Sequence, residues 1–203
     1  YGKIGCMSRM LKLKSRYTKN NDATLVTSDC LTFLRSLPKD SAQLVITSPP
    51  YNIGKSYERK RTTIAEYVAK QQKVIDEAVR IVRPGGSLCW QVGHYVNGHA
   101  QVIPIDMLLY PCFRAHEETN SIYLRNRIIW HFEFGFHSHH RFSGRHEVVL
   151  WFTKGINYKF YLDRLRVPQK YPGKRAYQGS RKGKLSGNPL GKNPGDVWIF
   201  PNV

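Results

Sequence analysis

Ala42-Gln-Leu-Val-Ile-Thr-Ser-Pro-Pro-Tyr51 joins a continuous apolar run to a turn that contains two prolines. Continuous apolar runs are typical of strands that are buried on both faces of a parallel sheet. Because proline cannot continue a sheet ladder, we expect the chain to leave the sheet at Ser48. The segment therefore predicts a buried strand over residues 42–47 that ends in a stiff, polar turn.

The flanking sequence alternates between the strand and helix patterns. A short strand is predicted over 23–27, and a helix over 30–37 follows it, with Ser28 or Asp29 as its cap. Beyond the turn, apolar spacing predicts a helix over about 63–82. Arg83-Pro-Gly-Gly86 ends that helix before a strand over 87–92. This order predicts an α/β fold with a parallel sheet, in which ligands bind at the carboxyl ends of the strands.

The next part of the chain predicts a short buried helix over 102–113 and two strands, 123–130 and 146–153. An aromatic, His-rich loop lies between these strands. Trp90, Trp130 and Trp151 fall in apolar strands, so we expect them in the core. His146-Glu147 opens the second strand, and we expect one of the two side chains to be buried and paired.

Charge narrows the classes of partner. The 203 residues include 32 Lys and Arg against 14 Asp and Glu, a formal net charge of +18. Such an excess indicates a polyanionic partner, either nucleic acid or an acidic membrane surface. No apolar run is long enough for a membrane span, and the first residues lack the apolar run of a signal peptide, so we expect a cytoplasmic protein. The four cysteines form no CxxC pair, and we expect neither a disulfide framework nor a metal site.

Three segments are expected along the chain. Residues 1–22 form a basic leader, either solvated or in contact with phosphates. Residues 23–154 form the catalytic domain, and residues 155–203 form a basic segment rich in Gly, Pro and Tyr. Two interpretations of this segment stay open. Its cations neutralise DNA phosphates and read base edges, or the segment is a plain basic linker. The DNA-contacting candidates there are Lys170, Lys174, Arg175, Arg181, Lys182 and Lys184.

The turn Ser48-Pro-Pro-Tyr51 carries the expected chemistry. The Pro49 carbonyl and the Ser48 hydroxyl offer two acceptors, and Tyr51 offers a flat aromatic face. Pro50 removes a backbone donor and stiffens the path. Two acceptors and a stacking plane suit the amino edge of cytosine or adenine. Acceptors on both N–H bonds make the nitrogen lone pair available for attack on a methyl group.

These residues give the sequence its resemblance to the DNA amino-methyltransferases of the N4-cytosine/N6-adenine family, in their permuted "beta" arrangement. Ser48-Pro-Pro-Tyr51 matches the catalytic motif, Ser28-Asp29 matches the acidic motif, and Arg141 to Lys154 matches a strand near the target-base pocket. The resemblance implies a Rossmann-like class I methyltransferase sheet with S-adenosylmethionine bound by Ser28, Asp29 and Ser48. Serine at position 48 is more typical of cytosine-N4 than of adenine-N6 enzymes. The Gly-rich cofactor loop of the family is absent, so we expect the chain to end before it.

The resemblance also implies a double-stranded DNA substrate whose target base leaves the stack. Further DNA contacts are expected from Lys55, Arg141 and Arg145. A restriction endonuclease, a complementing C-terminal half and a second copy of the chain are the other expected partners, in a nucleoid-associated bacterial, archaeal or phage protein. Two rival functions stay open: a DNA-binding module without catalysis, and a methyltransferase for RNA or protein glutamine.

Overall fold

The main sheet lies at the centre of the computed structural model, which describes residues 12–54, 58, 62–119, 121–135 and 137–200. Five strands pair in the order β3 (Ala42–Thr47), β4 (Val82–Val92), β8 (His146–Thr153), β7 (Tyr123–His131) and β9 (Val197–Ile199). The β3–β4 and β7–β9 pairs are parallel, whereas β8 runs antiparallel to both β4 and β7. The α/β class is confirmed, and the expected parallel sheet is corrected to a mixed one. The expectation that residues 42–47 form a buried strand is wrong, because β3 lies at the edge of the sheet and Leu44 and Ile46 are exposed.

The predicted first strand does not join this sheet. It shrinks to β2 (Ala23–Thr24), which pairs in parallel with β1 (Leu13–Lys14) as a separate two-stranded ribbon. Residues 12–22 therefore pack with the start of the expected catalytic domain. The apolar run after Ala23 is too short to decide between these two pairings.

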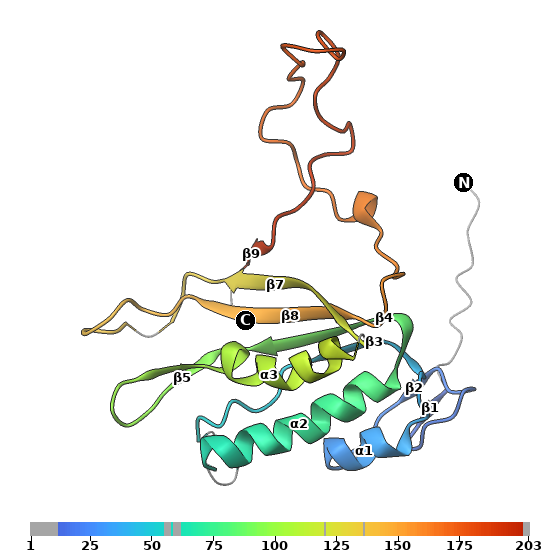
Figure 1. The fold of residues 1–203 in the computed structure, drawn as a ribbon, viewed down its shortest axis with the longest axis vertical. Helices are drawn as coiled ribbons and strands as arrows, with labels where there is room; N and C mark the ends of the chain where they lie inside the picture. Colours follow the sequence, from blue (N-terminus) through green and yellow to red (C-terminus); the bar gives the residue numbers. More distant parts are fainter. Residues whose placement is uncertain (1–11, 55–57, 59–61, 120, 136, 201–203) are drawn as a thin grey trace, which may run out of the picture.

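Three helices cover one face of the main sheet, as Figure 1 shows: α1 (Cys30–Ser36), α2 (Ile64–Ile81) and α3 (Ile105–Glu118). The core lies between these helices and the sheet. Phe113 of α3 stacks on Phe152 of β8, with ring centroids 4.6 Å apart, and meets Trp90 of β4 edge-on at 5.6 Å. All three rings are almost completely buried, so they contribute strongly to stability.

Helix α2 follows the sequence closely. A capping box joins Thr63 to Glu66 at its start, and the helix ends at Ile81. The strand predicted over 87–92 begins earlier, because β4 starts at Val82 and includes Arg83–Gly86. The Arg80 guanidinium donates to the carbonyls of Leu34 (2.8 Å) and Leu37 (2.9 Å). These bonds fix α1 against α2 and thereby fix the start of β3.

The predicted helix over 102–113 begins and ends later. Residues Val102–Pro104 form β6, which pairs with β5 (His94–Val96) as a small antiparallel hairpin. Helix α3 follows without a side-chain cap and continues past Pro111 to Glu118. The hairpin projects from the end of the sheet where β4 finishes (Figure 1).

The other face of the sheet is covered by the C-terminal segment. Trp151 stacks with Phe160 at 5.5 Å and meets Tyr158 at 5.8 Å, while the Trp130 indole N–H donates to the Phe200 carbonyl. Trp90 is in the core as predicted, but Trp130 and Trp151 are only half-buried on this second face. The period-2 pattern of a strand places alternate residues on opposite faces, and only one face contacts the helices.

Residues 166–192, here called the arm, extend away from the helix-free face of the sheet (Figure 1). A short 3-10 helix, η2 (Leu162–Arg164), leads into it. Val167 and Lys192 exchange backbone hydrogen bonds at its base, and Ala176 N–H donates to the Lys184 carbonyl at 2.9 Å further out. Within the described residues, no helix is long and apolar enough to cross a membrane.

Candidate active site

The turn Ser48–Tyr51 begins at the carboxyl end of β3, where the sequence places it. The side chains of Ser48 and Pro50 are exposed, Pro49 is buried, and Tyr51 is half-buried. The Ser48 hydroxyl lies 3.2 Å from the Tyr51 hydroxyl, within hydrogen-bonding distance. The turn therefore anchors one proline in the protein and presents a serine hydroxyl to the surface.

Glu147 at the start of β8 holds the Tyr51 ring in place. The Tyr51 hydroxyl donates to Glu147 Oε2 at 3.2 Å, and the Gln91 side-chain amide donates to the same oxygen. Burial raises the pKa of Glu147, and the hydrogen bonds from Tyr51 and Gln91 oppose that shift. The expectation of a paired residue at 146–147 is confirmed for Glu147, but this side chain is only half-buried, and His146 is exposed.

Gly93 directly follows β4, and its lack of a side chain leaves room for Tyr51 and Glu147 to lie close to the backbone there. A Cβ atom there would lie 3.1 Å from Tyr51 Cε2 and 3.3 Å from Glu147 Oε1. Both distances are tighter than ordinary van der Waals contact. Any larger residue at position 93 would push the Tyr51 ring or the Glu147 carboxylate. The sequence gives no signal for this role, because the contact joins three separate strand ends.

Asn52 closes the loop that follows the turn. It adopts a left-handed backbone conformation (φ 58°), and its side chain is buried. Its amide donates to the Thr62 carbonyl at 2.8 Å, and its carbonyl oxygen accepts from Thr62 N–H at 2.9 Å. These two bonds hold the turn against the start of α2. A pattern of asparagine after a proline turn was the available signal, since asparagine tolerates this conformation.

A hollow of about 320 Å³ opens beside the turn, between β3, α1 and α2. Ser48, Pro49 and Pro50 line it together with Cys30 and Phe33 of α1. Gln71 and Trp90 also line it, and each has a buried polar atom with no partner among the described residues, Gln71 Oε1 and Trp90 Nε1. Buried polar atoms normally find a partner, so this wall suits a polar ligand or ordered water.

Asp29 caps α1 and directly precedes Cys30, which lines this hollow. Its Oδ1 accepts from Thr32 N–H at 3.0 Å and from the Thr32 hydroxyl at 3.3 Å. The Ser28 hydroxyl donates to the Asp29 carbonyl at 3.2 Å. Both side chains are exposed. Capping by Asp29 is confirmed, and Asp29 Oδ2 remains available to a ligand; binding of a cofactor by Ser28 and Asp29 stays a prediction.

A second hollow of about 430 Å³ lies on the other side of Glu147. His94, His146 and Arg141 line it, as does the ion pair of the buried Asp106 with Arg127, whose nitrogen and oxygen are 2.7 Å apart. Burial and the nearby positive charges lower the pKa of His94. In the described part of the chain, no three His, Cys, Asp or Glu side chains form a group that could hold a metal ion.

The predicted DNA-contacting residues fall into two groups. Arg141 and Arg145 lie in the loop between β7 and β8, where Arg141 donates to the Ser138 hydroxyl and Arg145 to the Gly144 carbonyl. Lys55 lies outside the described residues. The others are exposed along the arm: Lys170, Lys174, Arg175, Arg181, Lys182 and Lys184. Six of the predicted DNA-contacting residues therefore belong to the arm, whereas Arg141 and Arg145 belong to the β7–β8 loop.

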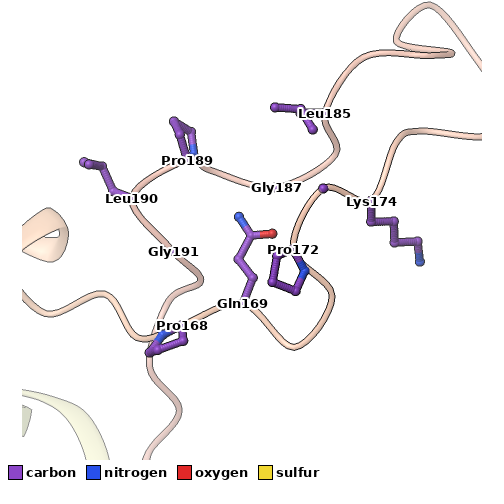
Figure 2. A pocket seen from close by; sticks show the side chains of 10 residues that line it. Pro168, Gln169, Pro172, Lys174, Leu185, Gly187, Pro189, Leu190 and Gly191 are labelled. Atoms are coloured by element: carbon purple, nitrogen blue, oxygen red, sulfur yellow. The ribbon is translucent and has the colours of Figure 1, made fainter.

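The arm encloses a hollow of its own, about 340 Å³ in volume (Figure 2). Pro168, Pro172, Pro189 and Leu190 give it apolar walls, and the Lys174 side chain points away from it in this view. The Gln169 side chain lies within the hollow and donates to the Asn188 carbonyl. This bond links the two sides of the arm and fixes its shape without a helix or sheet.

The architecture is similar to that of solved DNA methyltransferases. The fold resembles that of the PvuII DNA methyltransferase (cytosine-N4-specific), with a TM-score of 0.61 over 89% of this chain and 57% of that chain, at 19% identity. The α/β arrangement is thus that of a class I methyltransferase, as the sequence predicts.

The sequence comparisons define the family. The model of the N6/N4 family described as "DNA methylase" matches residues 42–203. Type II methyltransferase M.BglII of Bacillus subtilis is 46% identical over 94% of this chain and 52% of its own length. Type II methyltransferase M.ScaI of Streptomyces caespitosus is 36% identical over 92% of this chain and 58% of its own. The chain belongs to the DNA methylase family, and it spans about half the length of these curated relatives.

Proposed function

We propose that this chain carries the catalytic turn and the DNA-contacting arm of an S-adenosylmethionine-dependent DNA methyltransferase. The target is the exocyclic amino group of a base that leaves the helical stack, with cytosine N4 favoured over adenine N6. One observation carries the proposal: the Ser48 hydroxyl is exposed at the end of β3, held by Tyr51 and next to a hollow. The names of the relatives support a Type II, restriction-modification setting.

The residues around the turn suit the cofactor. The hollow of about 320 Å³ lies within the size range of small-molecule sites, and its wall holds the unpartnered Gln71 and Trp90 atoms. The exposed Asp29 directly precedes Cys30, which lines the hollow, and its Oδ2 can accept hydrogen bonds from hydroxyl or amino groups. Ser28, Asp29 and Ser48 would hold the cofactor, which supplies an electrophilic methyl group.

In the proposed mechanism the protein positions the target amino group and keeps water away from it. The Ser48 hydroxyl and the Pro49 carbonyl accept its two N–H bonds, and the Tyr51 ring packs on the base. The bound cofactor would supply the methyl group: its methyl–sulfur bond would break as the N–C bond forms, and one N–H proton would pass to solvent. No covalent bond to the protein forms, so catalysis consists of positioning and electrostatics.

The arm supplies the contacts to DNA in this proposal. Residues 166–192 contain eight Lys or Arg and no Asp or Glu. Exposed cations of this density neutralise backbone phosphates, and Arg and Gln side chains read base edges in the major groove. Arg141 and Arg145 would contact the strand that carries the extruded base, because their loop borders Glu147 and the second hollow.

The test measures transfer of a labelled methyl group from S-adenosylmethionine to duplex DNA. Ser48→Ala should lower the rate by about a hundredfold, the cost of losing one preorganised group at a reacting centre, while DNA binding is retained. Ser36→Ala is the control, because Ser36 is an exposed serine that bonds only the Phe33 carbonyl of its own helix. Transfer by Ser48→Ala at the wild-type rate would overturn the proposal. DNA binding by wild type without cofactor binding would favour a binding module, and preference for RNA would favour the other rival.

A further inference from the structure

The structure joins Ser48 to a half-buried carboxylate through one intermediate side chain. Ser48 Oγ lies 3.2 Å from Tyr51 Oη, and Tyr51 Oη lies 3.2 Å from Glu147 Oε2. Tyr51 and Glu147 are separated by 96 residues in the sequence, so the fold creates this chain of bonds. The proposed chemistry uses the Tyr51 ring, but it gives no role to the Tyr51 hydroxyl or to Glu147.

The Glu147 carboxylate sets the donor and the acceptor in both hydrogen bonds of this chain. An ionised carboxylate only accepts hydrogen bonds, so the Tyr51 hydroxyl donates to it. Its single proton is then used, and the Tyr51 oxygen is left as an acceptor for the Ser48 hydroxyl. Ser48 in turn has donated its only proton, so both of its lone pairs are available to a ligand. A carboxylate 96 residues away thereby makes serine an acceptor.

We propose that Glu147 is a positioning residue that acts through Tyr51 to present the Ser48 oxygen as an obligate acceptor for the amino group of the target base. The inference rests on the proposed function, which needs that acceptor. Without the carboxylate, the Ser48 proton is free to point at the ligand, where it would repel an N–H bond. The Gln91 amide keeps the Glu147 carboxylate in place from β4.

The surroundings of Glu147 support an ionised carboxylate. Burial raises its pKa, whereas the hydrogen bonds that Tyr51 and Gln91 donate to it stabilise the ionised form. The titratable or charged groups around it are Tyr51 of the turn, His94 of β5, Asp106 of α3, Arg127 of β7, Arg141 of the β7–β8 loop and His146 of β8. Asp106 is paired with Arg127, so the net contribution of that wall is small.

The test is a double-mutant cycle on methyl transfer with Glu147→Gln, Tyr51→Phe and both together. Glutamine keeps the shape and still receives the Gln91 bond, but it no longer fixes the direction of the Tyr51 proton. We expect Glu147→Gln to lower kcat by about tenfold with little change in KM for DNA, the effect of losing a hydrogen bond to a charged group. In the Tyr51→Phe background, Glu147→Gln should have no further effect, because the connection to Ser48 is already broken.

Tyr110 and Glu117 provide a matched control. Their side chains form the same kind of bond, at 2.8 Å, on α3. Glu117→Gln and Tyr110→Phe should leave kcat unchanged. Nuclear magnetic resonance of labelled tyrosine adds a readout independent of activity: Glu147→Gln should lower the pKa of Tyr51, since a neighbouring negative charge is lost.

Three results would overturn the inference: an unchanged kcat in Glu147→Gln, an equal loss of kcat in the wild-type and Tyr51→Phe backgrounds, or an unchanged Tyr51 titration. Absence of methyl transfer by the wild-type protein would instead count against the proposed function. An active wild-type protein with an unaffected Glu147→Gln variant would count against the inference alone. Urea unfolding of each variant separates loss of the fold from loss of the bond chain.

Discussion

The turn Ser48–Tyr51 and the arm are held in opposite ways. The turn is fixed by side chains from distant elements, with Tyr51 bound to Glu147 and Asn52 bound to Thr62. The arm is fixed mainly by bonds between its own residues, and all of its cations except Arg166 are exposed. Under the proposed function, the difference follows because methyl transfer needs one defined geometry, whereas contact with a polyanion needs charge density that tolerates adjustment. A single substitution should therefore have a large effect in the turn, whereas several substitutions are needed for a comparable effect in the arm.

The largest difference between the regions is expected for two asparagines. Asn52→Ala removes two buried hydrogen bonds and places alanine at a positive φ, so we expect a loss of about 2–4 kcal/mol of unfolding free energy. Asn188→Ala in the arm removes one exposed bond to Leu190 N–H and should cost under about 0.5 kcal/mol. Urea unfolding measures both. Equal losses would contradict the contrast between the two regions.

Removal of positive charge from the arm should weaken DNA binding and leave the free energy of unfolding unchanged. Changing Lys174, Lys182 and Lys184 together to Gln should weaken DNA binding about tenfold and reduce the salt dependence of log affinity by about 2–3. The matched control changes three exposed lysines elsewhere, Lys39, Lys70 and Lys73. Fluorescence anisotropy across a salt series measures the slopes. Identical slopes for the two triple variants would place the DNA contact outside the arm.

A smaller effect is expected at the helix that follows the turn. Thr63→Ala breaks the capping box of α2 and should cost about 1 kcal/mol. Ser186→Ala in the arm removes a bond to the Lys174 carbonyl at an exposed site and should change stability by a few tenths of a kcal/mol. Thermal unfolding monitored by circular dichroism compares them. A larger loss for Ser186→Ala would show that the arm is a cooperative part of the fold.

The smallest effect is expected from pH. Because burial raises the pKa of Glu147, the folded protein holds this proton more tightly than the unfolded chain does. That contribution is complete below the unfolded pKa of about 4.3 and is lost as pH rises through the folded pKa. Glutamine does not ionise, so the unfolding free energy of Glu147→Gln should rise relative to that of wild type as the pH increases above about 4. A difference that stays constant with pH would contradict the assigned burial.

Local patterns predicted much of this fold. Helix α2, the strands β7 and β8 and the capping by Asp29 follow from apolar spacing and end signals within each segment. The strand order, the pairing of β2 with β1 and the half-exposed Trp130 depend on contacts between segments, which periodicity does not encode. The sequence did not show which face of the sheet the helices cover.

The candidate site was predictable to the same extent. Ser48-Pro-Pro-Tyr51 is contiguous, and its chemistry could be argued from the residue types alone. One side chain of the pair His146-Glu147 was expected to be buried and paired, but the sequence does not say which one, and the partner of Glu147 lies 96 residues away. Gly93 and Gln91 matter only because β4 ends beside Tyr51, a position that the sequence does not specify.

The identity of the methylated atom tests the central claim most directly. DNA treated with the protein and S-adenosylmethionine is digested to nucleosides, which are identified by mass spectrometry. A turn that accepts two N–H bonds predicts N4-methylcytosine, or N6-methyladenine as the second candidate, and Ser48→Ala should remove either product. Methylation at a ring carbon such as C5 of cytosine would contradict the account, because a clamp on the amino group gives no means of activating carbon.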